Sequence, residues 1–166
     1  MTMTSAQLAI LATNIAADGT LSLLTKNSDS ADAIATAYNL TAVPDFWVSR
    51  TAIPVKEIYE TTTDVPTVWS WTAYIARSQA ERDAWREMTS GGVINASLTN
   101  VFQGVADIFS GAPGAAQRAH LSAMGRRRAT RIEKLLATGT GSTGSPAVMG
   151  FEGRLAISDV MRAWGF

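Results

Sequence analysis

The sequence predicts a mainly α-helical protein, a single-domain helical bundle with a long basic helix and a short β-hairpin or extended segments. Three observations lead to this fold class. Apolar residues recur at helical spacing in several stretches, capping residues precede those stretches, and segments containing glycine or proline separate them. The chain has 166 residues, enough for one hydrophobic core and too few for two comfortable ones. We therefore expect residues 1–166 to form one domain.

Three short helices are expected in the first part of the chain. The first carries apolar residues at helical spacing over 8–15 and stops at Asp18. The second runs through 33–38, and the third covers 55–60. Each has a residue that can cap or start it, in order Ser5, Ser28 or Asp29, and Pro54.

The middle of the chain is expected to hold a short strand followed by two helices. The run VWSW favours the strand, and a nearby proline places it at a sheet edge. Ser78 and Glu81 form an S-x-x-E capping box, in which each side chain accepts from the other residue's backbone N–H, so they predict a helix start. A further helix starts at Ser97 or Thr99 and ends before Gly111.

The longest predicted helix covers 115–138. Five arginines and a lysine lie within it, and Gly139 ends it, as glycine commonly does at a helix C-terminus. The residues that follow, 139–146, are rich in Gly, Ser and Thr and predict a flexible loop.

The final segment, 147–166, is expected to dock onto a neighbouring chain. It would start as a tight strand pair across Glu152-Gly153 and continue as a helix capped by Ser158. Its last residues, AWGF, are apolar and suited to contact a partner.

The composition limits the kinds of function that we expect of this chain. Hydrophobic residues make up 46% of the chain and charged residues 17%, a balance that fits a folded protein whose surface is partly covered by other chains. The formal net charge is zero, so any role on nucleic acid or an anionic membrane must be local. Polar residues interrupt the apolar positions of the first 19 residues, so we expect neither a signal peptide nor a membrane span, and a cytoplasmic protein.

Residues suited to catalysis or metal binding are scarce. The chain has no cysteine and one histidine, His120, which lacks a carboxylate at a recognisable triad spacing. The glycines of the loop 139–146 follow a helix and precede no lysine, the reverse of the order in a phosphate-binding loop. We therefore expect no enzymatic activity, no metal and no cofactor.

The basic run is the most distinctive charged feature. Residues 113–134 hold six basic residues and one acid, whereas residues 1–75 hold three basic and seven acidic ones. Consecutive arginines on a helix point in different directions. Three interpretations stay open: a solvated helix with internal pairs such as Glu133, a surface facing DNA, or salt bridges between identical subunits. The residues expected to face a DNA channel or another subunit are Arg126, Arg127, Arg128, Arg131 and Lys134.

Several aromatic residues and glycines are candidates for an interface. Two tryptophans lie two positions apart, so on a strand they would share one face, which would be either core or an interface hot spot. The loop and the apolar tail supply further candidates. The predicted docking or interface residues are Trp69, Trp71, Gly139, Gly141, Gly144, Trp164 and Phe166.

Two segments carry a resemblance to a known family. The sequences ARSQAERDAWREMTSGGVINASLTNVFQGVADIFSG and RRRATRIEKLLATGTGSTGSPAVMGFEG resemble small structural proteins of tailed bacteriophages, namely head-tail adaptors, also called connectors or head completion proteins. The resemblance extends over the second two-thirds of the chain. It is one of overall texture and includes no catalytic motif, and the Trp-rich segment 61–73 departs from it.

The resemblance implies a mostly helical subunit that forms a homo-oligomeric ring in the virion neck after assembly in the host cytoplasm. Such a ring would dock under the portal protein, contact a tail or tail-terminator protein, and extend the DNA channel, with non-specific contact to packaged DNA. It implies no active site, no cofactor and no membrane partner. The alternatives are a head decoration or tail-tube component, or a DNA-binding regulator.

Overall fold

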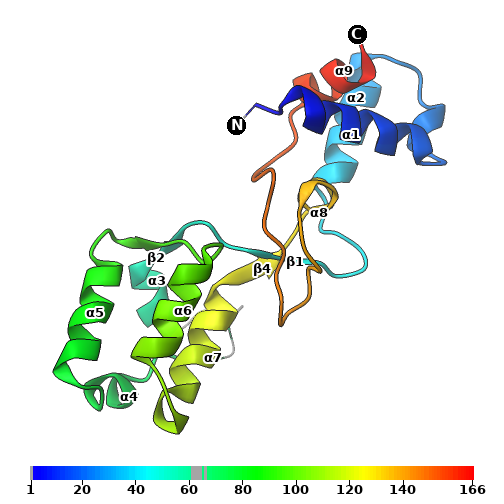
Figure 1. Cartoon of the computed structure of the whole chain (residues 1–166). Coiled ribbons are helices and arrows are strands. Elements are labelled where there is room, and N and C mark those ends of the chain that lie inside the picture. Colours follow the sequence, from blue (N-terminus) through cyan, green and yellow to red (C-terminus); the bar gives the residue numbers. More distant parts are fainter. Residues whose placement is uncertain (1, 61–64, 66) are drawn as a thin grey trace. The chain divides into compact units, whose positions relative to one another are not determined.

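The computed structural model describes residues 2–60, 65 and 67–166. Within these residues the chain is mainly α-helical with short strands, as the sequence predicts. The chain divides into two compact units (Figure 1): unit 1 contains Met1–Val48 and Arg128–Phe166, and unit 2 contains Ser49–Arg127. That residues 1–166 behave as one domain stays a prediction.

Unit 1 is built from helices that belong to two separate parts of the sequence. They are α1 (Ser5–Ala17), the 3-10 helix η1 (Leu21–Leu23), α2 (Ser28–Asn39), α8 (Arg131–Leu136) and α9 (Ile157–Trp164). The first two α-helices lie where the sequence predicts them, but their caps come just before the expected residues. The side chain of Thr4 caps α1, and that of Asn27 caps α2.

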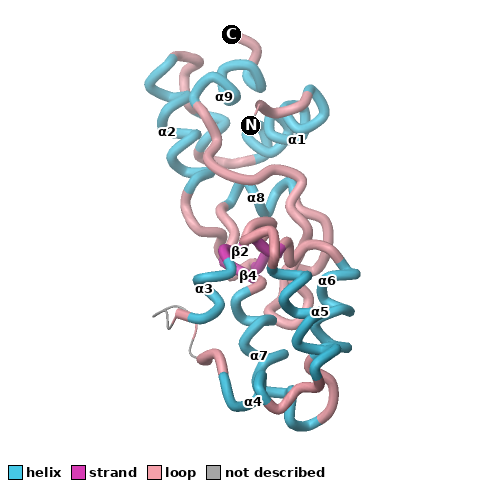
Figure 2. The backbone as a smooth tube through the Cα atoms, turned by 90° about the vertical axis from the view of Figure 1, so that its left-hand side faces the viewer, coloured by secondary structure: helices cyan, strands magenta, loops and turns pink. Residues whose placement is uncertain are grey.

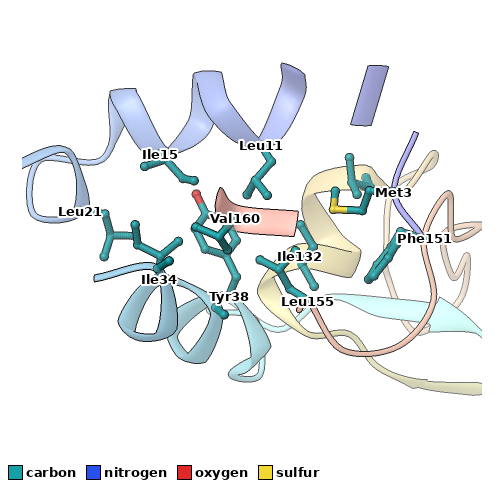
Figure 3. Packing of buried hydrophobic residues seen from close by; sticks show 13 residues of the cluster. Met3, Leu11, Ile15, Leu21, Ile34, Tyr38, Ile132, Phe151, Leu155 and Val160 are labelled. Atoms are coloured by element: carbon teal, nitrogen blue, oxygen red, sulfur yellow. The ribbon is translucent and has the colours of Figure 1, made fainter. Parts of the chain in front are cut away.

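The core of unit 1 lies between these helices. In Figure 3, Leu11 and Ile15 of α1 face Val160 of α9 and Tyr38 of α2, and all four side chains are fully buried. Helix α9 packs against both α1 and α2, as Figure 2 also shows. The C-terminal segment therefore completes a core together with helices from the start of the sequence.

Unit 2 is a group of short helices with one small sheet. Its helices are α3 (Val55–Tyr59), α4 (Trp71–Ile75), α5 (Gln79–Thr89), α6 (Thr99–Ile108), the 3-10 helix η2 (Ala112–Gly114) and α7 (Ala115–Met124). Helix α6 packs against α5 and α7 (Figures 1 and 2). Strands β2 (Ile53–Pro54) and β3 (Val93–Ile94) pair antiparallel, with Ile53 opposite Ile94. The predicted capping box of Ser78 and Glu81 is confirmed at the start of α5.

The prediction of one long basic helix over 115–138 is wrong. Helix α7 ends at Met124, the arginines form strand β4 (Arg126–Arg128), and α8 begins separately at Arg131. The helix cannot continue because the backbone of Ala129 is engaged elsewhere: its N–H donates to the carbonyl of Phe46, and its carbonyl accepts from the N–H of Ala42. Strand β4 pairs with β1 (Trp47–Ser49) in a two-stranded sheet.

Other local predictions are also wrong. The residues of the expected strand VWSW do not form one: Ser70 instead caps α4 and Trp71 is its first residue. No strand pair forms across Glu152-Gly153, because the N–H of Gly153 donates to the Glu133 carboxylate at 3.2 Å. Helix α9 starts after Ala156, not at a Ser158 cap. Gly139 does not end a helix, since α8 stops at Leu136.

The loop 139–146 carries a turn with its own hydrogen bonds. The Thr140 hydroxyl donates to the carbonyl of Ser145 at 3.0 Å, and the N–H of Ser145 donates to the Ser142 hydroxyl at 3.0 Å. The carbonyl of Gly141 accepts from the N–H of Trp47 at 2.7 Å. Gly141 has a φ of +66°, and a Cβ there would lie 2.2 Å from the Phe46 ring, so only glycine fits against this ring.

We predict that Gly141→Ala destabilises the protein by about 1–3 kcal/mol, because the added methyl group overlaps the Phe46 ring and the backbone is left-handed. The control is Gly144→Ala, where nothing lies within 4 Å of the new Cβ. Chemical denaturation of both variants and the wild type measures the difference. Equal free energies of unfolding for the two variants would contradict this view of the loop.

Candidate functional site

Unit 2 carries an exposed aromatic surface on α4. Trp71 is 53% exposed and Ile75, one turn further along α4, is 66% exposed, so the two side chains share a face of this helix. The Tyr59 ring lies beside Trp71, with ring centroids 5.2 Å apart. We call Tyr59, Trp71 and Ile75 the aromatic patch. Large apolar side chains left in water in this way are typical of contact surfaces.

The predicted pairing of Trp69 with Trp71 on one face is wrong. Trp69 is only 8% exposed, and its ring stacks on Trp85 at 5.3 Å and meets Phe109 edge-on at 5.7 Å. Because Ser70 caps α4 instead of continuing a strand, Trp69 points into the core of unit 2 and Trp71 points out. Trp69 therefore supports the aromatic patch from behind, 5.9 Å from the Trp71 ring.

Two buried polar residues of α7 hold the segment that carries these tryptophans. The side-chain amide of Gln117 pairs with both backbone groups of Ser70, accepting from its N–H at 3.0 Å and donating to its carbonyl at 3.1 Å. The Nε2–H of His120 donates to the carbonyl of Ile58 at 2.8 Å, and its Nδ1 is hydrogen-bonded to the Thr67 hydroxyl at 3.0 Å. Both ring nitrogens of His120 thus serve packing.

Unit 1 carries a pocket of about 510 Å³. The end of α2, the segment 40–43 and one face of α8 form its walls. Its lining is apolar apart from two cations and two small polar side chains: Asn14, Ala37, Leu40, Thr41, Ala42, Val43, Arg131, Lys134 and Leu135. We call it the cationic pocket. Leu40 and Val43, at 63% and 87% exposed, project from its rim.

Two aromatic rings and one carboxylate contact the two cations of the cationic pocket. The Arg131 guanidinium lies 4.4 Å from the centroid of the Tyr38 ring and donates to the Asp18 carboxylate at 2.6 Å. The Lys134 Nζ lies 5.6 Å from the centroid of the Phe46 ring. Both contacts are cation–π interactions, which orient the charged groups on the same face of α8.

The ion pair with Arg131 changes the acidity of its partner. The hydrogen bond from Arg131, together with the backbone N–H groups of Leu21 and Thr20, lowers the pKa of the Asp18 carboxyl from 3.8 to about 2. The neighbouring Tyr38 is buried and its hydroxyl donates to the Asn14 amide oxygen at 2.7 Å. Burial raises the pKa of the Tyr38 phenol.

The structure separates the predicted basic residues. Arg131 and Lys134 line the cationic pocket, whereas the three consecutive arginines lie on β4, where alternate side chains point to opposite faces. Arg128 pairs with Asp45, and Arg126 donates to the Ser122 hydroxyl at 3.5 Å. The expectation that these residues share one helix is therefore wrong. Whether these arginines face DNA or another subunit stays a prediction.

The remaining predicted interface residues lie in unit 1. Trp164 is partly buried against the unit 1 core, and the Lys26 ammonium donates to its carbonyl at 2.6 Å. Phe166 is exposed, with its ring 6.0 Å from that of Trp164. In the loop, Gly139 lies against Ala147, and Gly144 has open space around it. Docking of this tail or loop onto another chain stays a prediction.

Across residues 2–60, 65 and 67–166, no three His, Asp or Glu side chains are grouped so that they could hold a metal ion. Nor does this part of the chain contain a helix with the length and apolar character needed to cross a membrane.

Comparison of the chain with models of protein families, with curated proteins and with solved structures found no match in any of the three. Its function is therefore inferred from the aromatic patch and the cationic pocket.

Sequence reasoning missed the residues that position both surfaces. Gln117 was not singled out, although it shares a helical stripe with His120, Leu121 and Met124, all buried on α7. Polar residues at such positions are a signal of internal hydrogen bonding. Leu40 and Val43 gave no signal, because single apolar residues are common in exposed loops.

We predict that Gln117→Ala destabilises the protein by about 1–3 kcal/mol, because it leaves the N–H and carbonyl of Ser70 without their partner. The emission spectrum of the tryptophans should shift in the folded variant, since Ser70 holds Trp69 and Trp71 in place. Gln103→Ala is the control, because that side chain bonds only an exposed Asp107. Unchanged stability and emission for Gln117→Ala would contradict the role assigned to this residue.

We predict that the Asp18–Arg131 pair makes stability depend on pH between about 4 and 2. A carboxyl whose pKa is lower in the folded state than in the unfolded state stabilises the fold above its unfolded value, 3.8, and the contribution disappears as pH falls towards 2. Above pH 4, Asp18→Asn should be less stable than the wild type, and the difference should shrink as pH falls to 2. Denaturation at each pH measures it, and in an Arg131→Gln background most of this pH dependence should be lost.

Proposed function

We propose that this chain is a structural protein of a tailed-bacteriophage neck, a head-tail adaptor that forms an oligomeric ring between portal and tail and extends the DNA channel. The observation that carries the proposal is the aromatic patch. Trp71 stays more than half exposed although the segment behind it is fixed by Gln117 and packed on Trp69. A rigid aromatic side chain in water is suited to bind a partner with little loss of conformational entropy.

The cationic pocket supports the same proposal. It lies in unit 1, whereas the aromatic patch lies in unit 2. A chain with two different contact surfaces can bind two neighbours at once, as a subunit of a ring must. The resemblance of residues 76–111 and 126–153 to neck proteins gives the proposal its location in the virion.

In this proposal the arginines of β4 make the contact with DNA. Arg126 and Arg127 are partly exposed, and Arg128 is exposed beside Asp45. Arginine binds phosphate through paired N–H groups, and a channel that only guides DNA needs no contact to its bases. In the proposed ring these side chains line the channel or a neighbouring subunit.

The test is assembly on the portal. We expect the purified chain, mixed with the portal protein of the same phage, to add a coaxial ring in cryo-electron micrographs. Trp71→Ala should weaken this assembly, through contacts among copies or with the portal, by about 30-fold or more, as for a typical interface hot spot. The matched control is Leu23→Ala, since Leu23 is also exposed but lies in unit 1 on η1.

Other outcomes would overturn the proposal. A ring with the symmetry of the capsid surface or of the tail tube would assign the chain to head decoration or to the tube. A chain that stays monomeric beside the portal and binds free duplex DNA with steep salt dependence would be a DNA-binding regulator.

A further inference from the structure

We propose that Trp71 of one copy inserts into the cationic pocket of a second copy, so that identical chains join head to tail. This inference rests on the proposed function, because it names the partner of the aromatic patch. It commits to a second copy because the chain itself carries both a projecting aromatic side chain and a pocket that is large enough for it and is lined by two cations.

The cationic pocket is large enough for the Trp71 side chain. The cationic pocket, at about 510 Å³, falls in the range of roughly 300–1,000 Å³ that is typical of small-molecule sites, so it has room for an indole ring. A second hollow of about 380 Å³ shares Asn14 and Leu135 with it and is lined by apolar residues of α1 such as Ile10. Trp71 and Ile75 project one turn apart on α4, so the pair suits two adjoining hollows.

The two cations of the pocket suit the face of an indole ring. The face of an indole ring is electron-rich and attracts cations, and tryptophan is the strongest aromatic partner for them. Arg131 and Lys134 already lie against the rings of Tyr38 and Phe46. The ion pair with Asp18 holds Arg131 in place before binding, so its side chain loses little freedom on contact.

The rim of the pocket supplies the apolar part of the contact. Leu40 and Val43 stand in water in the isolated chain, and an inserted indole would cover both, with release of the water around them. A contact of an apolar rim around a central tryptophan has the arrangement of an interface hot spot.

The two surfaces differ, so their contact is heterologous. Each copy offers its patch to one neighbour and its pocket to another, and such contacts close into rings or extend into filaments. This is the geometry that an adaptor ring requires.

The experiment measures self-association of the purified full chain by sedimentation velocity and native mass spectrometry from micromolar to near-millimolar concentration. We expect Trp71→Ala and Lys134→Glu each to weaken self-association by about 30-fold or more. Trp71→Phe, which keeps an aromatic ring, should retain most of it. Leu23→Ala and Lys56→Glu are the matched controls, since both alter exposed residues outside the two surfaces.

Mixing the two defective variants distinguishes a specific contact from misfolding. Trp71→Ala retains an intact pocket, and Lys134→Glu retains an intact patch. The 1:1 mixture should therefore form a heterodimer with one working contact and nothing larger, while each variant alone stays monomeric. Circular dichroism confirms that both variants are folded.

Three results would overturn the proposal: a wild-type chain that is monomeric at every concentration, variants that associate like the wild type, or a mixture that stays monomeric. These results are separable from failure of the proposed function. A chain that is monomeric alone but forms a ring on the portal would refute this contact and keep the adaptor. A self-associating chain that ignores the portal would keep the contact and overturn the adaptor.

Discussion

The pairing of residues 40–46 with residues 129–131 is the interaction on which unit 1 depends. Three backbone hydrogen bonds make it: the N–H of Ala42 donates to Ala129, that of Ala129 to Phe46, and that of Arg131 to Leu40. They hold the rim of the cationic pocket against the start of α8, so the apolar and the charged walls of the pocket are fixed by one set of contacts. The same bonds prevent a continuous helix through the arginines, since a backbone group that is used across the chain cannot also bond within a helix.

In unit 2, the short helix α4 holds the large ring of Trp71 exposed to water. Five residues of α4 would be marginal alone. The buried amide of Gln117 and the ring of His120 replace a longer helix or a sheet partner by binding the backbone and hydroxyl groups of the segment 67–70 and the end of α3. Polar groups in a core are costly unless they are satisfied. Here the amide of Gln117 and both ring nitrogens of His120 have partners, and they hold the segment that carries the two tryptophans.

The sequence was informative where structure is decided locally. The capping box of Ser78 and Glu81 needs only residues three positions apart, and it was predicted and found. The arginine segment was mispredicted as helix because its conformation depends on residues 42 and 46, more than 80 positions away, which no local pattern reveals. For the site, Trp71, Arg131 and Lys134 were predicted from residue type, but the pocket was not, because Leu40 and Val43 become neighbours of α8 only in the fold. Trp69 was assigned to the wrong environment because a two-residue period was assumed where a helix begins.

Unit 2 interrupts unit 1 in the sequence, and this order matters during synthesis. When the ribosome has completed residue 127, unit 2 has all the residues of its own core. Helices α1 and α2, made earlier, must wait for α8 and α9 before Leu11, Ile15 and Ile34 are covered. Contiguous units can fold as they emerge, so unit 2 can fold before unit 1 is complete. The apolar faces of α1 and α2 stay uncovered in the nascent chain until α8 and α9 have been made.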